Sequence, residues 1–409
     1  MVTAPLIAAL VGSGTAVVYI VAAIPAALVA QGMSANDRRD PHKGSVYTWV
    51  RRRLPRTGWF AGFCLASTGI IATSGMAYVA ADLLIPSAPT PVKALLATAL
   101  TAVAAVIDLY KLRVMAVLQY LAVIAGIGAM IVCVALMAGG AVHLAPVTGS
   151  PLDWFRAVLL AVFAYWGFDA IFALTEHTAV GAPQRVTVLT MAALVAFSVV
   201  GGTAYSAVDP TPVTGNPIVR IAVISSAVMS LGSTLIPTAR GIEAMADAGE
   251  VPSWAGALTR TSRATAVVTV ASVAWTGLLF VSEGLFNDTI EALSVLVGLY
   301  FTANSLIAAL HGGSGGERVG QAVSVGLMAL ITAAVGIQTL DPAYGETAVG
   351  GADGVGGVGL IVIGLCAIGG VGALRYGARP AAEGGRRAAE GGRPSALPSA
   401  LPSGAHEGT

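Results

Sequence analysis

Seven residues near the middle of the chain have the composition of a ligand site inside a helix: Phe163-Ala-Tyr-Trp-Gly-Phe-Asp169. They lie in an apolar run from about residue 152 to 174, and roughly 20 apolar residues can cross a bilayer as a helix. A carboxylate such as Asp169 costs roughly 2.5–3.5 kcal/mol inside hydrocarbon, so it needs a partner or water. The adjacent Gly167 lets a helix open and turn its backbone groups toward a ligand. The pattern predicts a broken helix that binds a solute at mid-membrane; the alternative is a packed helix with one tolerated acid.

The composition is that of a polytopic membrane protein. Of the 409 residues, 56% are hydrophobic and 11% are charged, and the mean hydropathy is +0.80. A soluble domain carries about 25% charged residues. The formal net charge of +1 suggests no nucleic-acid partner. Cys64, Cys133 and Cys366 are far apart and lack CxxC spacing, which suits small core residues rather than a disulfide framework.

Eleven apolar runs are separated by proline, glycine and charged clusters, and we predict that all eleven are helices. Strand alternation is absent, and a barrel does not produce continuous apolar runs of this length. The tail from Arg375 onward is rich in Ala, Gly, Pro, Ser, Arg and Glu, and we expect it to be disordered. The predicted spans are about 13–34, 59–82, 90–107, 113–138, 155–175, 186–207, 217–238, 264–282, 290–310, 320–338 and 355–374.

The basic residues predict the orientation of these spans. If the loop from Asp37 to Arg56 is cytoplasmic, only Lys93, Arg156 and Arg220 fall on the other side, which leaves 19 of the 22 Lys and Arg on the cytoplasmic side. Cytoplasmic loops carry such an excess. We therefore expect a multi-pass protein of the cell membrane with a cytoplasmic C-terminal tail, and with Met1 outside.

Three segments in register resemble a known family. The first is Arg39-Asp-Pro-His-Lys-Gly-Ser-Val-Tyr-Thr-Trp-Val50, followed by a basic cluster and Gly58-Trp-Phe-Ala-Gly62. The second is the Phe163–Asp169 segment with Thr175-Glu176 downstream. The third is Ile236-Pro-Thr-Ala-Arg240 with Met245-Ala-Asp-Ala-Gly-Glu-Val-Pro252. Together they are similar to the amino acid permeases of the amino acid–polyamine–organocation (APC) transporter superfamily.

The resemblance implies a LeuT-like fold, which is a five-plus-five inverted repeat with two extra C-terminal helices and with the first and sixth helices broken at the midplane. Here only residues 1–11 precede Gly12, so the first helix is expected to be incomplete. Either the recorded start is too late, or the protein is shortened, or the stub fuses with the second helix. The expected organisation is a remnant of the first helix (1–11), a transmembrane transporter domain (12–374) and a disordered tail (375–409).

The resemblance also implies a substrate site. The substrate's ammonium meets backbone carbonyls around Ala164, Tyr165 and Trp166 at the break, and its carboxylate meets N–H groups at a half-helix start. Trp166 and Phe168 wall or gate the pocket, and Asp169 holds a cationic group or a coupling proton. The half-helix start is assigned to Thr3, Ala4 and Pro5.

Hydroxyl residues recur every four positions in the seventh predicted span, which places them on one helix face. Ser230 and Thr234 are candidates to line the transport pathway. The favoured alternative is a small-residue seam between packed helices. The four positions are Ser226, Ser230, Thr234 and Thr238.

The expected function is secondary transport of an amino acid or related amine, with protons as the candidate coupling ion. No metal-ligand spacing, cofactor fingerprint or Ser/His/Asp arrangement appears, so we expect neither a cofactor nor an enzyme. An intramembrane enzyme is the least favoured alternative. A transport-inactive relative that acts as a membrane sensor or scaffold is the second hypothesis, and the incomplete first helix favours it.

Overall fold

The computed structural model describes residues 4–110, 112–139, 146–178, 181–207, 217–252, 258–311, 314–349 and 354–377. The described chain is helical apart from one short hairpin. Its helices are α1 (Ala4–Val11), α2 (Thr15–Arg39), α3 (Ser45–Arg51), α4 (Pro55–Leu84), α5 (Thr90–Tyr110), α6 (Leu112–Gly139), α7 (Pro151–Ala164), α8 (Ala182–Ala207), α10 (Pro217–Asp247), α11 (Thr261–Thr276), α12 (Glu283–Glu291), α13 (Leu293–His311), α14 (Gly315–Gln338) and α15 (Gly357–Tyr376). The 3-10 helices are η1 (Gly12–Gly14), η2 (Phe168–His177) and η4 (Gly277–Phe280), and the strands are β1 (Ala348–Val349) and β2 (Val355–Gly356).

Eleven segments of the described chain are long and apolar enough to cross a bilayer, which confirms the predicted number of spans. Several helices extend beyond their predicted ends, because polar and charged residues can continue a helix past the hydrocarbon. Helix α10, for example, runs on to Asp247, and α15 includes Arg375 and Tyr376 of the segment assigned to the tail. Residues 378–409 of the predicted tail lie outside the described residues.

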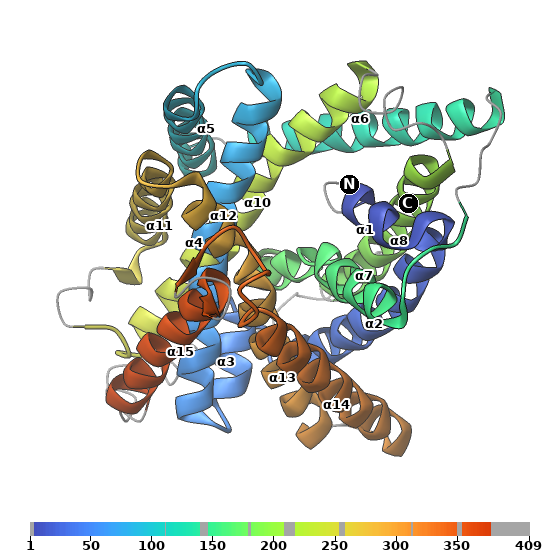
Figure 1. The fold of residues 1–409 in the computed structure, drawn as a ribbon. Coiled ribbons are helices and arrows are strands. Elements are labelled where there is room, and N and C mark those ends of the chain that lie inside the picture. Colours follow the sequence, from blue (N-terminus) through green and yellow to red (C-terminus); the bar gives the residue numbers. More distant parts are fainter. Residues whose placement is uncertain are drawn as a thin grey trace, which may run out of the picture.

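The helices form two groups, and α4 contributes residues to both of the main cores. Figure 1 shows α1, α2, α7 and α8 together on one side and α4, α5 and α11 on the other, with α10 beside α4. The larger core includes Val29 of α2, Leu159 of α7 and Phe172 of η2, and it continues into α3, α4, α13 and α14. The second core joins α4, α5, α10 and α11 through small and branched side chains such as Ala105 and Leu235. Helix α13 contacts both α2 and α4, so it links the two groups.

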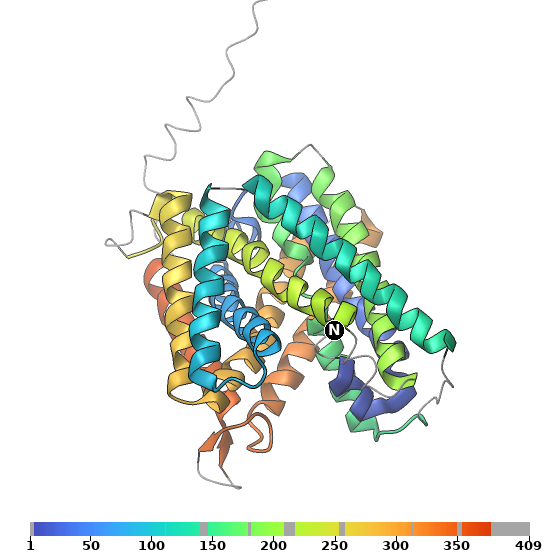
Figure 2. The same ribbon diagram turned by 90° about the horizontal axis from the view of Figure 1, so that it is seen from above.

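Two ends of the molecule are distinguished by their contents. The β1–β2 hairpin lies at the same end as α1 in Figure 2, and we call this the hairpin end. The opposite end carries the arginine-rich segment from residue 38 to 56, and we call it the basic end. Because β1 and β2 are two residues each, they cap the connection between α14 and α15 rather than form a sheet of the core.

Helix α3 closes the basic end by binding a buried carboxylate. Glu250, fully buried in the turn after α10, accepts hydrogen bonds from Arg51 Nε (2.6 Å) and the Tyr47 hydroxyl (2.8 Å). The indole of Trp59 on α4 donates to the backbone carbonyl of the same residue (2.8 Å). One glutamate therefore joins α3, α4 and the end of α10.

A second set of charges reinforces this closure. Lys43, in the connection between α2 and α3, pairs with Glu243 (2.7 Å) and Asp247 (2.7 Å) of α10. The Thr261 hydroxyl at the start of α11 also donates to Glu243 (2.7 Å). These charged and polar contacts join the α2–α3 connection, α10 and the start of α11 at the basic end.

His42 organises the connection into α3. Its Nδ1 accepts the backbone N–H of Gly44 (3.0 Å) and lies 3.1 Å from the Thr48 hydroxyl. Since the Gly44 N–H needs an acceptor, Nδ1 carries no proton and the ring is neutral. Burial lowers the pKa of His42 below its ordinary value of 6.5, against the opposing pull of the nearby carboxylates. The charged groups that act on the ring are Glu176, Asp40, Arg52 and Lys43.

Replacing Glu250 with alanine should destabilise the protein strongly. The change leaves Arg51 and Tyr47 without their acceptor, and removing one partner of a buried ion pair costs about 3 kcal/mol or more. Melting of the detergent-purified protein measures this. Arg52→Ala is the matched control, because Arg52 pairs with Asp40 (2.9 Å) but its side chain is 58% exposed. Exposed pairs contribute about 0–1 kcal/mol. Equal melting temperatures for the two variants would contradict the role given to Glu250.

Acidification should destabilise the wild type through His42. In the unfolded chain the imidazole binds a proton near its ordinary pKa of 6.5, whereas the folded protein resists protonation. Stability is therefore full above pH 6.5 and falls as the pH drops below that value, by at most about 1.4 kcal/mol per pH unit. His42→Asn keeps an acceptor for the Gly44 N–H and cannot titrate. The variant should lack this part of the pH dependence of the melting temperature, and an unchanged profile would refute the assignment.

Candidate functional site

The predicted break is present in the structure. A capping box starts α7, in which the Ser150 hydroxyl accepts the Asp153 N–H and Asp153 caps the Ser150 N–H. The helix ends at Ala164, and Gly167 has φ +116° and ψ −14°, in the left-handed region that favours glycine. The chain then continues as η2, a 3-10 helix of ten residues. Runs of 3-10 helix longer than 3–4 residues are uncommon and often mark a functional hinge.

The break leaves backbone acceptors free. No described residue donates a hydrogen bond to the carbonyl oxygens of Ala164, Tyr165 or Trp166. A Cβ built on Gly167 would meet no atom within 4 Å, so the backbone here borders open space. In a membrane such carbonyls are tolerated only where they face protein, water or a ligand. Carbonyl oxygens are acceptors, and their natural ligand is a cation or an N–H donor.

Asp169 lies two residues beyond the break and has a neutral partner. The Tyr300 hydroxyl of α13 donates to Asp169 Oδ2 (2.9 Å), and the Trp166 indole donates to the same hydroxyl. Among the described residues, no Lys, Arg or His pairs with this carboxylate. The site thus combines an uncompensated acid with free carbonyls, an arrangement that attracts a proton or an ammonium group.

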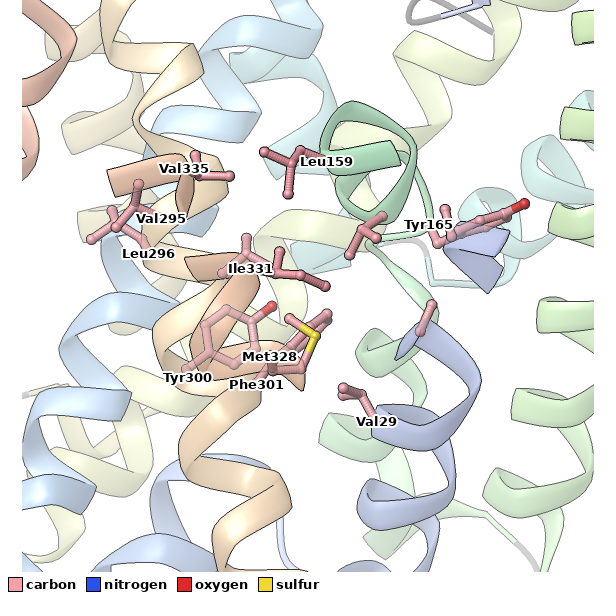
Figure 3. Close-up of a cluster of buried hydrophobic side chains, with 14 of the residues drawn as sticks. Val29, Leu159, Tyr165, Val295, Leu296, Tyr300, Phe301, Met328, Ile331 and Val335 are labelled. Atoms are coloured by element: carbon pink, nitrogen blue, oxygen red, sulfur yellow. The ribbon is translucent and has the colours of Figure 1, made fainter. Parts of the chain in front are cut away.

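Aromatic contacts hold the two sides of the break in place. The Tyr165 hydroxyl donates to the carbonyl of Tyr19 on α2 (2.8 Å), and Phe168 packs on Phe301 of α13 with ring centroids 5.6 Å apart. Figure 3 shows Tyr300 and Phe301 beside Met328, with Tyr165 on the far side of α7. The site residues therefore diverge: Tyr165 anchors the break to α2, while Trp166, Phe168 and Asp169 contact α13.

The far end of η2 is fixed near the basic end. Asp37 of α2, 2% exposed, accepts the Thr175 hydroxyl (2.8 Å) and the Gln184 amide (2.8 Å). Glu176 accepts the Lys43 N–H (3.3 Å) and lies 4.0 Å from Arg240. Hydrogen bonds therefore fix η2 at both ends, to α13 near its start and to α2 and the α2–α3 connection near its end.

Ser230 and Thr234 of α10, the predicted pathway residues, make hydrogen bonds within their own helix. The Ser230 hydroxyl donates to the Ser226 carbonyl in its own helix (2.7 Å), and Thr234 offers its carbonyl to the Thr238 hydroxyl (2.6 Å). No described hydrogen bond joins either residue to the break. A Cβ on Gly69 of α4 would lie 1.8 Å from Thr238 Oγ1, so this turn of α10 is a close-packed seam.

The start of α1 was the expected second half of the site. The Thr148 N–H donates to the Val11 carbonyl (3.4 Å), which places the end of α1 beside the start of α7 at the hairpin end. Eight helical residues then carry Ala4 about 12 Å deeper. Thr3 lies outside the described residues, as do the side chains of Ala4 and Pro5. The assignment of these three residues stays a prediction.

The sequence analysis did not identify Tyr300 as a site residue. It is fully buried and bonded to both Trp166 and Asp169, yet in the sequence it is one aromatic residue in an apolar run. No local pattern distinguishes such a tyrosine from a core residue. Only the pairing of α13 with the break identifies it.

Comparison with known proteins agrees with this geometry. Residues 1–214 match the model of a family described as amino acid permease, and the chain belongs to that family. Two solved structures of an Eremococcus coleocola manganese transporter are similar. A mutant form has 14% identity, a TM-score of 0.54 and 89% coverage of each chain. A complex with an aromatic bis-isothiourea substituted compound has 13% identity, a TM-score of 0.48 and 88% coverage of each chain. No curated protein sequence matches.

Family and fold together define the class. The chain is a multi-pass membrane transporter with the LeuT-like fold, as the resemblance to the APC superfamily implied. The inverted repeat within that fold stays a prediction.

Substituting Gly167 with alanine should impair the site without a steric clash. The methyl group has room, but φ +116° is strained for a residue with a Cβ, at about 1–3 kcal/mol. We expect transport to fall at least tenfold in vesicles. Gly364→Ala in α15 is the matched control, because its Cβ also meets nothing within 4 Å but its backbone is helical. Wild-type transport by Gly167→Ala would show that the left-handed turn is dispensable.

Proposed function

We propose that this chain is a secondary transporter that moves an amino acid or a related amine across the cell membrane in exchange for, or together with, protons. One observation carries the proposal: a mid-membrane carboxylate without a cationic partner lies beside three backbone carbonyls with no donor. A substrate ammonium satisfies both features. Bound between them, it would compensate the charge that otherwise disfavours Asp169 in the membrane.

The alternating-access mechanism follows from the two helix groups. The smaller core joins α4, α5, α10 and α11, and the larger core joins α2, α7, α13 and α14 with part of α4. The broken element α7–η2 contacts the linking helix α13 through Asp169 and Phe168. Rocking one group against the other would expose the site to one side at a time. In this proposal Asp169, Tyr300 and Trp166 sense occupancy, because a ligand that binds the carboxylate competes with the tyrosine hydroxyl.

Orientation is part of the proposal. The basic end faces the cytoplasm under the positive-inside rule, so the C-terminal tail is cytoplasmic. The ion pairs of Glu250 and Lys43 then hold the cytoplasmic end closed in this conformation. The carboxylate-binding half of the site is assigned to Thr3, Ala4 and Pro5, of which Thr3 and Ala4 have backbone N–H groups to donate. Trp166 and Phe168 are the proposed pocket walls, and Ser230 and Thr234 are placed along the pathway.

Manganese, the cargo of the similar structures, does not transfer to this chain, because 14% identity supports a common fold alone. Manganese therefore enters as one arm of the test. A transport-inactive sensor or scaffold is the other outcome.

Uptake by proteoliposomes tests the proposal. The panel consists of labelled amino acids, polyamines and Mn²⁺, with and without an imposed pH gradient. We expect gradient-dependent uptake of an amino acid or amine. Asp169→Asn should abolish the gradient dependence and lower uptake at least tenfold, a loss of about 1.4 kcal/mol. Tyr300→Phe keeps the carboxylate and should weaken uptake while preserving the dependence on the gradient.

Asp82→Asn is the control, because Asp82 pairs with Lys93 at the end of α4 and is half exposed. Gradient-dependent uptake that survives in Asp169→Asn would remove the proton role. Uptake of Mn²⁺ alone would replace the substrate class, and no uptake of any compound would favour the sensor.

A further inference from the structure

Two exposed arginines at the basic end have no carboxylate partner among the described residues. Arg56 lies in the first turn of α4 and Arg375 in the last turn of α15. Most of their basic neighbours are already paired, so the carboxylates in those pairs are not available to Arg56 or Arg375. The pairs are Arg38 and Arg39 with Glu317, Arg51 with Glu250, Arg52 with Asp40, and Lys43 with Glu243 and Asp247.

A close helix contact brings the two arginines together. Figure 1 shows α15 alongside α4. Gly377, which ends α15, lies directly against the start of α4: a Cβ built on it would be 2.9 Å from Arg56 Cα and 3.0 Å from Trp59 Cβ. Arg375 is two residues before this glycine, so both arginine side chains leave the backbone next to the same contact.

An aromatic stack supports the guanidinium group of Arg375. Its Cζ lies 5.6 Å from the centroid of the Tyr376 ring, in a cation–π arrangement. The Tyr376 ring stacks on Trp59, with centroids 6.1 Å apart and an interplanar angle of 23°. Trp59 is itself fixed, because its indole donates to the Glu250 carbonyl. The charge of Arg375 is therefore held over a rigid platform.

An apolar stripe leads from Arg375 into the membrane. Ile368, Val371 and Leu374 recur every three residues on α15, which places them on one helix face. They are 62%, 65% and 69% exposed, so this face does not pack on another described helix. On a membrane-spanning helix, such a face borders lipid acyl chains. The arginine pair thus lies where the headgroup of a lipid beside α15 would be.

We propose that Arg56 and Arg375 bind the phosphate group of an anionic phospholipid whose acyl chain lies along Ile368, Val371 and Leu374. Arginine presents paired N–H donors that match phosphate oxygens in a bidentate geometry. Basic side chains at the membrane surface attract anionic lipids, whereas the phosphate of a zwitterionic lipid is offset by its own cation. The inference goes beyond the proposed function, because it does not depend on the solute that is transported.

The composition of residues 378–409 favours a lipid over this segment as the occupant. The segment follows Gly377 directly, but its basic residues are at least as numerous as its acidic ones, so it has no negative charge to offer the pair. The basic residues are Arg379, Arg386, Arg387 and Arg393, and the acidic ones are Glu383, Glu390 and Glu407.

The bound lipid would stabilise the closed basic end. Trp59 joins the proposed site to Glu250, which also accepts hydrogen bonds from Arg51 and Tyr47 of α3. A headgroup that bridges Arg56 and Arg375 holds α15 against α4 at this junction. Because a ligand that binds only the folded protein stabilises it, the lipid should raise the melting temperature.

Titration of the detergent-purified full-length protein tests the site. The probes are dioleoyl phosphatidylglycerol, dioleoyl phosphatidylcholine and inorganic phosphate. Native mass spectrometry gives the affinity for each lipid, and the melting temperature is measured with each of the three probes. We expect phosphatidylglycerol to bind most tightly and to raise the melting temperature. Phosphatidylcholine and inorganic phosphate should have little effect, because one lacks net charge and the other lacks the acyl chain.

Arg56→Gln and Arg375→Gln should each weaken phosphatidylglycerol binding about fivefold, which corresponds to about 1 kcal/mol, and the double variant should weaken it about 25-fold. Arg263→Gln is the matched control. Arg263 is also exposed, lies at the start of α11 near the basic end, and forms no ion pair with a described residue. Its loss should leave the affinity unchanged.

The double lysine variant separates loss of the ligand from damage to the fold. It keeps both charges but lacks the bidentate geometry, so its affinity should fall between those of the wild type and the double glutamine variant. The site is wrong if the double glutamine variant binds phosphatidylglycerol like the wild type, or if Arg263→Gln weakens binding equally. It is also wrong if inorganic phosphate stabilises the protein as phosphatidylglycerol does, or if the lysine variant binds no better than the glutamine variant.

Discussion

A helix that opens in the middle of a membrane must find partners for its backbone, and this constraint shapes the structure around Gly167. The bilayer core offers no water or lipid group that hydrogen-bonds to exposed peptide N–H and C=O groups. The chain meets the constraint by tightening into a long 3-10 helix after the break and by anchoring both of its ends. What it leaves unsatisfied is the set of carbonyls at Ala164, Tyr165 and Trp166. These unsatisfied carbonyls lie at the place where a ligand is useful.

The break is positioned by the helices around it. Tyr165 joins it to α2, and Asp169 and Trp166 join it to α13 through one hydroxyl. Since α13 also contacts α4, the hydrogen bonds of the site connect the two helix groups. A change of charge at Asp169 therefore acts on the contact between groups, and this is the physical route from occupancy to conformation in the proposed mechanism.

The buried and half-buried charges at the basic end are paired. Glu250, Lys43 and their partners lie within hydrogen-bond distance of one another, and His42 is kept neutral by burial. These pairs join α3 and the connection before it to the end of α10, so they hold this interface together.

Composition alone determined that this is a polytopic membrane protein, because an 11% charged chain cannot expose its surface to water. The run from Phe163 to Asp169 determined the break. Its glycine weakens a helix, and its carboxylate is costly inside an apolar span unless it finds a partner. Tertiary structure decided the rest. Tyr300 is 131 positions from Asp169, and the hydrogen bonds of the Ser230 hydroxyl and the Thr234 carbonyl stay within their own helix. Spacing along a chain specifies which residues share a helix face, but only the packing of one helix on another decides which face meets the site.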